Sequence, residues 1–200
     1  MTKNKYRETV NYYKKLKNRW FIEFLDDIAY ISDGCMIIAM DKDEYTRYII
    51  PKIAGIPQYT ENKKYTIEKG VCIEGTNNLA KWYKQAFNVS FIDAYKSSIL
   101  IDTSTMYSGS STMARAFTWN VNGKTEGALI NDWFYDISTE HSDGSYYATK
   151  KNAPILTNGE VVAGTGMIIL PIHYKDYSAF GQILECMNAK RKLDELKQTA

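Results

Sequence analysis

The sequence is poor in the residues that build disulfide frameworks and metal sites. Cys35, Cys72 and Cys186 form an odd, widely spaced set in 200 residues, so reduced thiols of a cytosolic protein are expected. There are two histidines, His141 and His173, and neither has a second ligand at the spacing of a metal site. The sequence therefore argues against a disulfide scaffold and against structural zinc.

Long apolar runs are also missing. The first 19 residues are polar and basic, unlike a secretory signal peptide. The longest apolar run, residues 166–172, has the length of a strand and is far shorter than the roughly 18 residues of a membrane span. These absences predict a cytoplasmic protein without membrane association.

No catalytic or phosphate-binding motif occurs. The sequence has no G-x-x-x-x-G-K-[ST] loop and no serine in a G-x-S-x-G turn. The acidic run 41–44 lacks the glycine and distal glutamate of a calcium loop, so helix capping explains it better. Nothing beside Cys35 would lower the pKa of its thiol. We therefore expect a non-enzymatic protein that holds no metal and no cofactor.

Aromatic residues, in contrast, are abundant. The chain contains 16 Tyr, 7 Phe and 4 Trp, and 44% of its residues are hydrophobic. Disordered chains are poor in aromatics, and a chain of this length can bury a sizeable core. One large domain, or one domain with helical extensions, is expected.

The strand and turn patterns predict an α+β fold of antiparallel sheets with a few short helices. Asp33-Gly34, Lys69-Gly70 and Asn122-Gly123 are dipeptides typical of tight hairpins. Short helices that interrupt runs of hairpins favour α+β over a parallel sheet. Strands are predicted at 20–25, 28–32, 35–40, 65–67, 71–73, 89–94, 98–102, 113–121, 124–130, 155–156 and 166–172.

Amphipathic helices are predicted at both ends of the chain, which divides it into a basic helix (1–19), a body (20–174) and a C-terminal helix (175–200). Inside the body, a capping-box pattern at Asp41 and Glu44 starts a helix that should stop before Pro51. Thr76 should cap a further helix. Its apolar side is predicted to carry Leu79, Trp82, Tyr83 and Phe87.

Positive charge is concentrated near the N-terminus. Residues 1–19 hold seven basic residues against one acidic residue, a net charge of +6, whereas the remaining chain carries −4. Such a surface attracts phosphate backbones, although charge runs often are only solvated helix faces. The predicted nucleic-acid contacts are Lys3, Lys5, Arg7, Lys14, Lys15, Lys17 and Arg19.

Two further groups of residues are candidates for binding. In Lys81-Trp82-Tyr83-Lys84 the aromatics would either stack on single-stranded bases or, as we favour, belong to a core with a charged rim. A stripe on the C-terminal helix would either pack on the body or pair with a second chain as a homodimer. The stripe consists of Phe180, Ile183, Leu184 and Met187, with Leu196 further along.

Three parts of the sequence resemble bacterial DNA sliding clamps. The hairpin ISDGCMIIAM (31–40) resembles the x-T-D-G-x-x-x-A hairpin of clamps, and INDWFYD (130–136) resembles a segment in which Asn precedes an aromatic and an Asp. Segments 153–157 and 166–172 resemble the closing pair of clamp strands. The pattern is also similar to clamp-like proteins of firmicute phages and mobile elements.

The resemblance implies layers of β-strands, no catalysis, self-association and electrostatic contact with the DNA backbone, in the cytoplasm of a bacterial host cell. It favours an accessory protein of a phage or mobile element that acts on DNA or on a replication protein. The alternative is a phage-type inhibitor that binds a host defence or regulatory protein, or that sequesters a small signalling molecule. Exposed Tyr and Trp side chains would anchor such an interface. An enzyme of unrecognised type is a third hypothesis.

Overall fold

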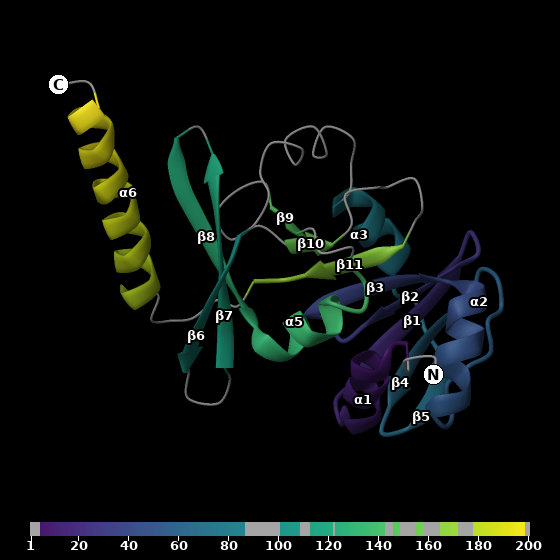
Figure 1. The fold of residues 1–200 in the computed structure, drawn as a ribbon. Coiled ribbons are helices and arrows are strands. Elements are labelled where there is room, and N and C mark those ends of the chain that lie inside the picture. The colour runs from purple at the N-terminus through teal and green to yellow at the C-terminus, as the bar shows by residue number, and fades with distance from the viewer. Residues whose placement is uncertain are drawn as a thin grey trace.

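The computed structural model of the chain describes residues 5–86, 101–108, 113–121, 123–142, 146–148, 155–157, 165–171 and 178–198 (Figure 1). The helices are α1 (Arg7–Lys15), α2 (Lys42–Glu44), α3 (Leu79–Ala86), α5 (Asp132–Ser138) and α6 (Ser178–Gln198). The strands are β1 (Trp20–Leu25), β2 (Ile28–Ser32), β3 (Met36–Asp41), β4 (Lys64–Glu68), β5 (Val71–Glu74), β6 (Ile101–Ser108), β7 (Met113–Val121), β8 (Lys124–Asn131), β9 (Tyr146–Tyr147), β10 (Ile155–Thr157) and β11 (Gly166–Ile169).

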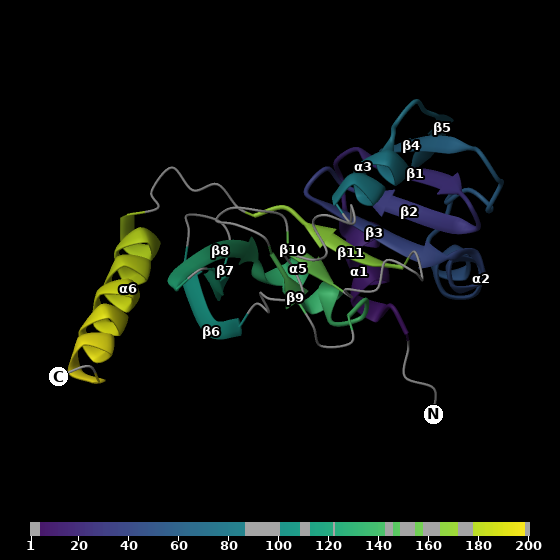
Figure 2. The ribbon, with the colours of Figure 1, turned by 90° about the horizontal axis from the view of Figure 1, so that it is seen from above.

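Two antiparallel sheets organise these elements. The larger has the strand order β5-β4-β1-β2-β3-β11-β10-β9, and the smaller has the order β6-β7-β8. In both views of the ribbon, α6 lies at one end of the molecule and α2 at the other (Figures 1 and 2). The expected α+β class, with antiparallel sheets and mostly short helices, is confirmed.

The two faces of the larger sheet are covered by different helices. Trp20, Ile22 and Phe24 of β1 point into the main core, which also contains Val10 and Tyr13 of α1. The alternate residues of the strands point to the other face, where Tyr30 meets Leu79, Ala80 and Tyr83 of α3. Helices α1 and α3 therefore lie on opposite faces of the same sheet.

The main core continues into the smaller sheet. Phe117 and Trp119 of β7 and Ile130 of β8 are buried in the same cluster as the residues of α1. Phe134 and Ile137 of α5 complete this cluster between the two sheets. One continuous core thus joins the N-terminal helix to strands that lie more than a hundred residues away in the sequence.

The predicted hairpins form where their turn residues indicated. Asp33 holds the β2–β3 turn, because its Oδ1 accepts from the backbone N–H groups of Cys35 and Met36 at 2.8 and 3.0 Å. Lys69 and Gly70 take the positive φ values, 51° and 78°, that a two-residue hairpin turn requires. The Asn131 side chain accepts from the N–H of Trp133 and caps helix α5.

Several predicted boundaries are wrong. Asp41 caps α2 as expected, but Glu44 does not complete a capping box, because its carboxylate accepts from Lys5 and Tyr6 instead. The helical segment runs past Pro51 through a π-helical turn (Tyr45–Ile49) and a 3-10 turn (Ile50–Lys52). Pro51 is tolerated because it is the second residue of the 3-10 turn, and the first residues of a helical turn need no N–H donor. Two strand ends differ as well, since β6 continues to Ser108 past the predicted end at 102, and β11 ends at Ile169 before the predicted end at 172. Residues 89–94 and 98–100 of the predicted strands lie outside the described residues.

Helix α3 also differs from the prediction. It begins at Leu79, three residues after Thr76, and the buried carboxylate of Glu23 on β1 accepts from the N–H of Ala80 at 2.9 Å. Tyr83 is buried as expected, but the predicted apolar position Trp82 is wrong, because this indole is 55% exposed. Tertiary contacts, rather than the local capping residue, therefore set the start and the rotation of this helix.

Candidate nucleic-acid interface

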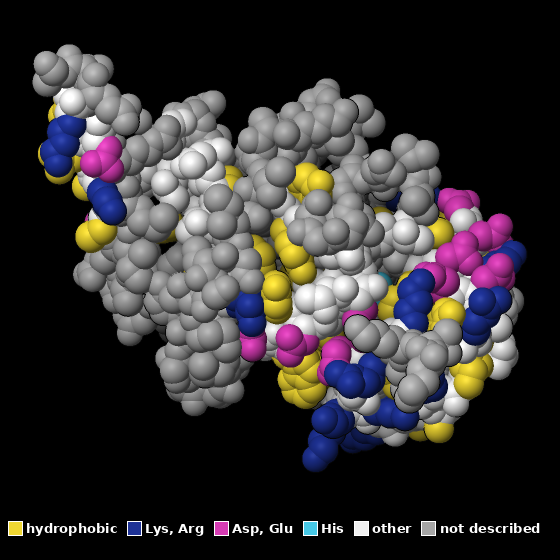
Figure 3. Space-filling view, in the orientation of Figure 1, with side chains coloured by type: hydrophobic (Ala, Val, Ile, Leu, Met, Phe, Trp, Pro, Cys, Tyr) yellow, Lys and Arg dark blue, Asp and Glu magenta, His cyan; other side chains and the backbone are white. Residues whose placement is uncertain are grey.

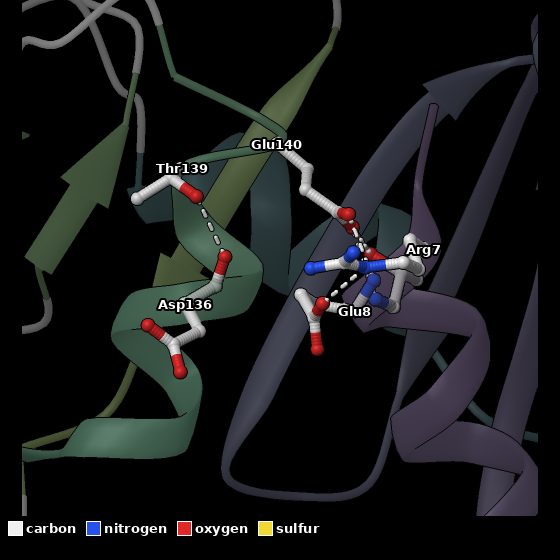
Figure 4. A network of polar contacts seen from close by, with 6 residues as sticks. Arg7, Glu8, Asp136, Thr139 and Glu140 are labelled. Atoms are coloured by element: carbon white, nitrogen blue, oxygen red, sulfur yellow. Dashed lines mark hydrogen bonds and ion pairs between the residues drawn. The ribbon is translucent and has the colours of Figure 1, made fainter. Parts of the chain in front are cut away.

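The basic N-terminal segment is a short helix docked on the body of the protein. Val10, Tyr12 and Tyr13 bury one side of α1 in the main core. The opposite side carries the lysines, as expected of an amphipathic surface helix. Glu140, from the turn that follows α5, reaches the first turn of α1, where it accepts from the N–H groups of Glu8 and Thr9 at 2.8 and 2.9 Å (Figure 4).

Three of the predicted nucleic-acid contacts are engaged in ion pairs. Lys5 pairs with Glu44, Arg7 pairs with Glu8, and Arg19 pairs with Glu68. Each partner neutralises a charge that would otherwise be offered to a phosphate. Lys3 lies outside the described residues.

The remaining three cations gather at the C-terminal end of α1. Lys14 and Lys15 lie in the last turn of the helix and Lys17 follows two residues later, and all three are exposed. No acidic side chain in the described ranges forms an ion pair with any of them. Figure 3 shows Lys and Arg side chains gathered at the end of the molecule where α1 lies. We call Lys14, Lys15 and Lys17 the lysine cluster.

An exposed tryptophan lies beside the lysine cluster. Trp133 is the second residue of α5, and its side chain is 40% exposed. The Lys15 ammonium lies over the indole, with Nζ 5.8 Å from the ring centroid. The ring of Tyr12 meets the indole at 85° with 5.3 Å between centroids. Cation–π and edge-to-face contacts of this kind hold the end of α1 against α5.

The polar groups around this tryptophan are fixed by further contacts. The Tyr12 hydroxyl donates to Asp33, and burial together with this carboxylate raises the pKa of Tyr12. Asp132 accepts from the Arg115 guanidinium at 2.9 Å, so its charge is compensated within the protein. Partial desolvation raises the pKa of the exposed Asp136 carboxyl, with a smaller contribution from the Asp132 charge. The Asp132 charge is thus compensated by Arg115, whereas no acidic side chain in the described ranges compensates the lysine cluster.

The predicted partner stripe on the C-terminal helix is described only at Leu184, which is buried. The side chains of Phe180, Ile183 and Met187 lie outside the described residues, and Leu196 is exposed. Helix α6 lies beside β8, where the Asn188 amide donates to the Thr125 carbonyl oxygen at 3.0 Å and accepts from the Thr125 N–H at 2.7 Å. A role of this helix in dimerisation stays a prediction.

Two hollows lie away from the lysine cluster. A polar cavity of about 330 Å³ is lined by Lys5, Tyr6, Glu44, Glu140 and His141, among others. An apolar groove of about 300 Å³ lies between the sheet and α3, where it is lined by Ile37, Trp82, Ala86, Ile168 and Leu170. Among the described residues, no three His, Cys, Asp or Glu side chains are grouped as metal ligands, and no helix has the length and apolar character to cross a membrane.

Comparisons with known proteins give one weak match. No family model matches the chain, and neither does any curated protein. A solved structure of a putative DNA polymerase III beta subunit from Eubacterium rectale aligns with a TM-score of 0.38 and 13% identity. The alignment covers 84% of this chain and 63% of that protein, so the chain spans less than two thirds of its length. The matched protein is of the kind that the sequence resembles, and a shared role stays a prediction.

The sequence pointed to the lysines but not to the tryptophan beside them. The aromatic pattern of residues 131–137 fits either a helix or a strand, so it assigns no exposed face to Trp133. The signal that would have helped is Asn131, because an N-cap there places residue 133 in the first turn of a helix. The contact with Lys15 joins residues more than a hundred positions apart and has no local signature.

Proposed function

We propose that the protein is a non-enzymatic, clamp-like accessory protein that contacts nucleic-acid backbone through the lysine cluster. The observation that carries the proposal is the set of three exposed cations, Lys14, Lys15 and Lys17, without acidic partners among the described residues. The proposal includes action on DNA or on a replication protein in a bacterial host. Its phage or mobile-element origin rests on the resemblance in the sequence alone.

Electrostatics support a backbone contact at this site. A cation that is already paired gains little from a phosphate, whereas an unpaired lysine releases a counterion from the nucleic acid when it binds. Lys14 and Lys15 also lie at the negative end of the helix dipole, where positively charged ammonium groups are stabilised. Contacts of this kind need no base recognition, so the expected binding is independent of sequence and sensitive to salt.

A charge-neutralisation experiment tests the proposal. Lys14, Lys15 and Lys17 are changed together to Gln, and binding to a fluorescent DNA is measured over a range of salt concentrations. Each phosphate contact makes the slope of log affinity against log salt more negative by about 0.9. The slope of the triple variant should therefore be shallower than that of wild type by up to about three times this value. The matched control changes Lys42, Lys63 and Lys84 to Gln, which removes the same charge from lysines that are already paired.

The control fixes how the result is interpreted. If both triple variants weaken binding equally, only net charge matters and the lysine cluster is not an interface. Wild-type binding that stays unchanged as salt rises would contradict the electrostatic contact altogether.

The alternative function, inhibition of a host protein, is favoured by the apolar groove beside α3. Trp82 and Leu170 are 55% and 45% exposed there, and large exposed apolar side chains in a groove are typical of protein-binding surfaces. The two functions are separated by two sets of variants. Loss of activity in the host after Trp82→Ser and Leu170→Ser, with the lysine triple variant still active, would favour the inhibitor.

A further inference from the structure

We infer that the interface prefers single-stranded over duplex nucleic acid, because Trp133 is placed to stack on an unpaired base while the lysine cluster holds the adjacent phosphates. This inference rests on the proposed function. It goes beyond that function by assigning a base-stacking residue and a substrate class to the site. The juxtaposition that carries it is the exposed indole with the Lys15 ammonium 5.8 Å from its ring centroid.

The packing of the described residues gives no explanation for the exposure of Trp133. A tryptophan buries more apolar surface than most side chains, so leaving 40% of it in water forgoes stabilisation. The indole contacts one described aromatic ring, that of Tyr12, which meets it at 85° and does not stack on it. A stacking partner from outside the chain would therefore cover surface that the described fold leaves open.

The tryptophan is held firmly enough to act as a platform. Asn131 Oδ1 accepts from its backbone N–H at 2.9 Å, which fixes the first turn of α5. The ion pair between Asp132 and Arg115 ties the same turn to β7. Phe134, the next residue, is buried in the main core. Because the backbone on both sides is anchored, little conformational entropy is lost when a base binds.

An aromatic platform beside cations distinguishes single strands from duplexes. In a duplex each base is stacked on its neighbours, so an indole outside the helix meets only sugar and phosphate. In a single strand the bases turn outward and stack on aromatic side chains, while lysines track the backbone. Stacking of this kind does not select the base or the sugar, so single-stranded DNA and single-stranded RNA share the required chemistry.

The chain offers a matched control for this role. Trp82 is even more exposed, at 55%, but lies on α3, on the opposite face of the larger sheet from α1. The neighbouring Lys84 is paired with Asp26. Trp20 and Trp119 are buried and should not respond to a stacked base.

The test measures binding of oligo(dT), oligo(U) and a duplex, each about 12 nucleotides or base pairs long. Wild type should bind both single strands more tightly than the duplex. Trp133→Ala should weaken single-strand binding by roughly 5- to 150-fold and duplex binding by less than about twofold. Trp133→Phe should recover part of the loss, and Trp82→Ala should change nothing. Thermal unfolding of each variant verifies that it is folded.

Tryptophan fluorescence gives a second measurement that does not depend on affinity. In the Trp82→Phe background oligo(dT) should quench the emission, and the additional change Trp133→Phe should abolish the quenching. Tight binding of oligo(dT) but not oligo(U) would narrow the substrate to DNA. Equal losses for duplex and single strand on Trp133→Ala, without quenching, would overturn the inference and leave the backbone contact intact. Absence of binding to any of the three would refute the proposed function and the inference together.

Discussion

Thr9 donates both its backbone N–H and its hydroxyl to the same oxygen of Glu140, Oε2, at 2.9 and 2.8 Å. Thr9 is fully buried, and the second carboxylate oxygen accepts from the N–H of Glu8 at 2.8 Å. The two residues are 131 positions apart in the chain, so this contact fastens the N-terminal helix to the turn after α5. It also takes the place of a local cap, because Tyr6 at the N-cap position forms no side-chain capping bond.

Removal of this carboxylate should loosen helix α1. Glu140→Ala leaves buried donors of the first turn without an acceptor, and we expect a loss of about 2 kcal/mol in the free energy of unfolding, measured by urea denaturation. Glu140→Gln should restore part of this loss. The control is Asp136→Asn, which alters an exposed carboxyl on the neighbouring helix and should change stability by less than about 0.5 kcal/mol. Equal effects of Glu140→Ala and Asp136→Asn would show that the contact does not stabilise the docked helix.

A buried histidine makes the same region sensitive to acid. His141 is stacked on the Tyr6 ring, with 4.8 Å between centroids, and its Nε2 lies 2.9 Å from Thr9 Oγ1. Since the Thr9 hydroxyl donates to Glu140, it must accept from Nε2–H, so Nε2 carries a proton. Burial, assisted by the Lys5 charge, lowers the pKa of His141 to about 3.

The unfolded chain therefore binds a proton at His141 that the folded chain excludes. The stabilising effect of the neutral imidazole is fully present above about pH 6.5 and is lost as pH falls from there toward about pH 3. At pH 5 the loss should be about 2 kcal/mol. Nuclear magnetic resonance of the imidazole protons verifies the cause, with His173→Gln used to assign the single remaining signal. A titration of that signal near pH 6.5 in the folded protein would contradict this account.

Local rules predicted the hairpins, and distant contacts decided the rest. The β4–β5 turn was predictable because Gly70 takes the positive φ that a tight hairpin needs, and the dipeptide Lys69-Gly70 alone indicates such a turn. The exposure of Trp82 was not predictable from its neighbours, because Glu23 on strand β1 sets where α3 begins. The lysines were visible as a charge run. Which basic residues of this run are unpaired depends on distant acidic residues. Glu68, for example, pairs with Arg19 because the register of β1 against β4 places the two residues side by side.

One buried hydroxyl on α1 is expected to lower stability. The Tyr13 side chain lies in the main core, and its hydroxyl is buried with no hydrogen-bond partner among the described residues. Burial raises the pKa of this phenol well above its usual range, so it stays neutral. Tyr13→Phe removes an unsatisfied polar group and should raise the free energy of unfolding by about 1 kcal/mol.

The control for this substitution is a tyrosine whose hydroxyl is used. Tyr45 donates to the carbonyl oxygen of Pro57 at 2.7 Å, so Tyr45→Phe should destabilise by about 1 kcal/mol. Both variants are compared with wild type by urea denaturation. If Tyr13→Phe also lowered the free energy of unfolding, the Tyr13 hydroxyl would have a hydrogen-bond partner in solution.

Gly166 should be the least replaceable of the glycines with defined surroundings. Its φ is +141°, and a Cβ there would lie 2.8 Å from the carbonyl oxygen of Thr157 on the paired strand β10. Thr157 cannot move aside, because its buried hydroxyl donates to the His141 carbonyl and accepts from the Met167 N–H, each at 2.8 Å. Gly166→Ala therefore combines backbone strain with a clash against fixed backbone.

Gly34 separates these two effects. Its φ of +91° is also positive, but a Cβ there meets nothing within 4 Å. Gly34→Ala should cost about 1 kcal/mol from strain alone, whereas Gly166→Ala should cost about 3 kcal/mol or more because the clash is added. Urea denaturation of the two variants measures the difference. Equal costs would show that β11 can shift away from β10, and in that case the His141 resonance should move in the Gly166 variant, since Thr157 connects the two.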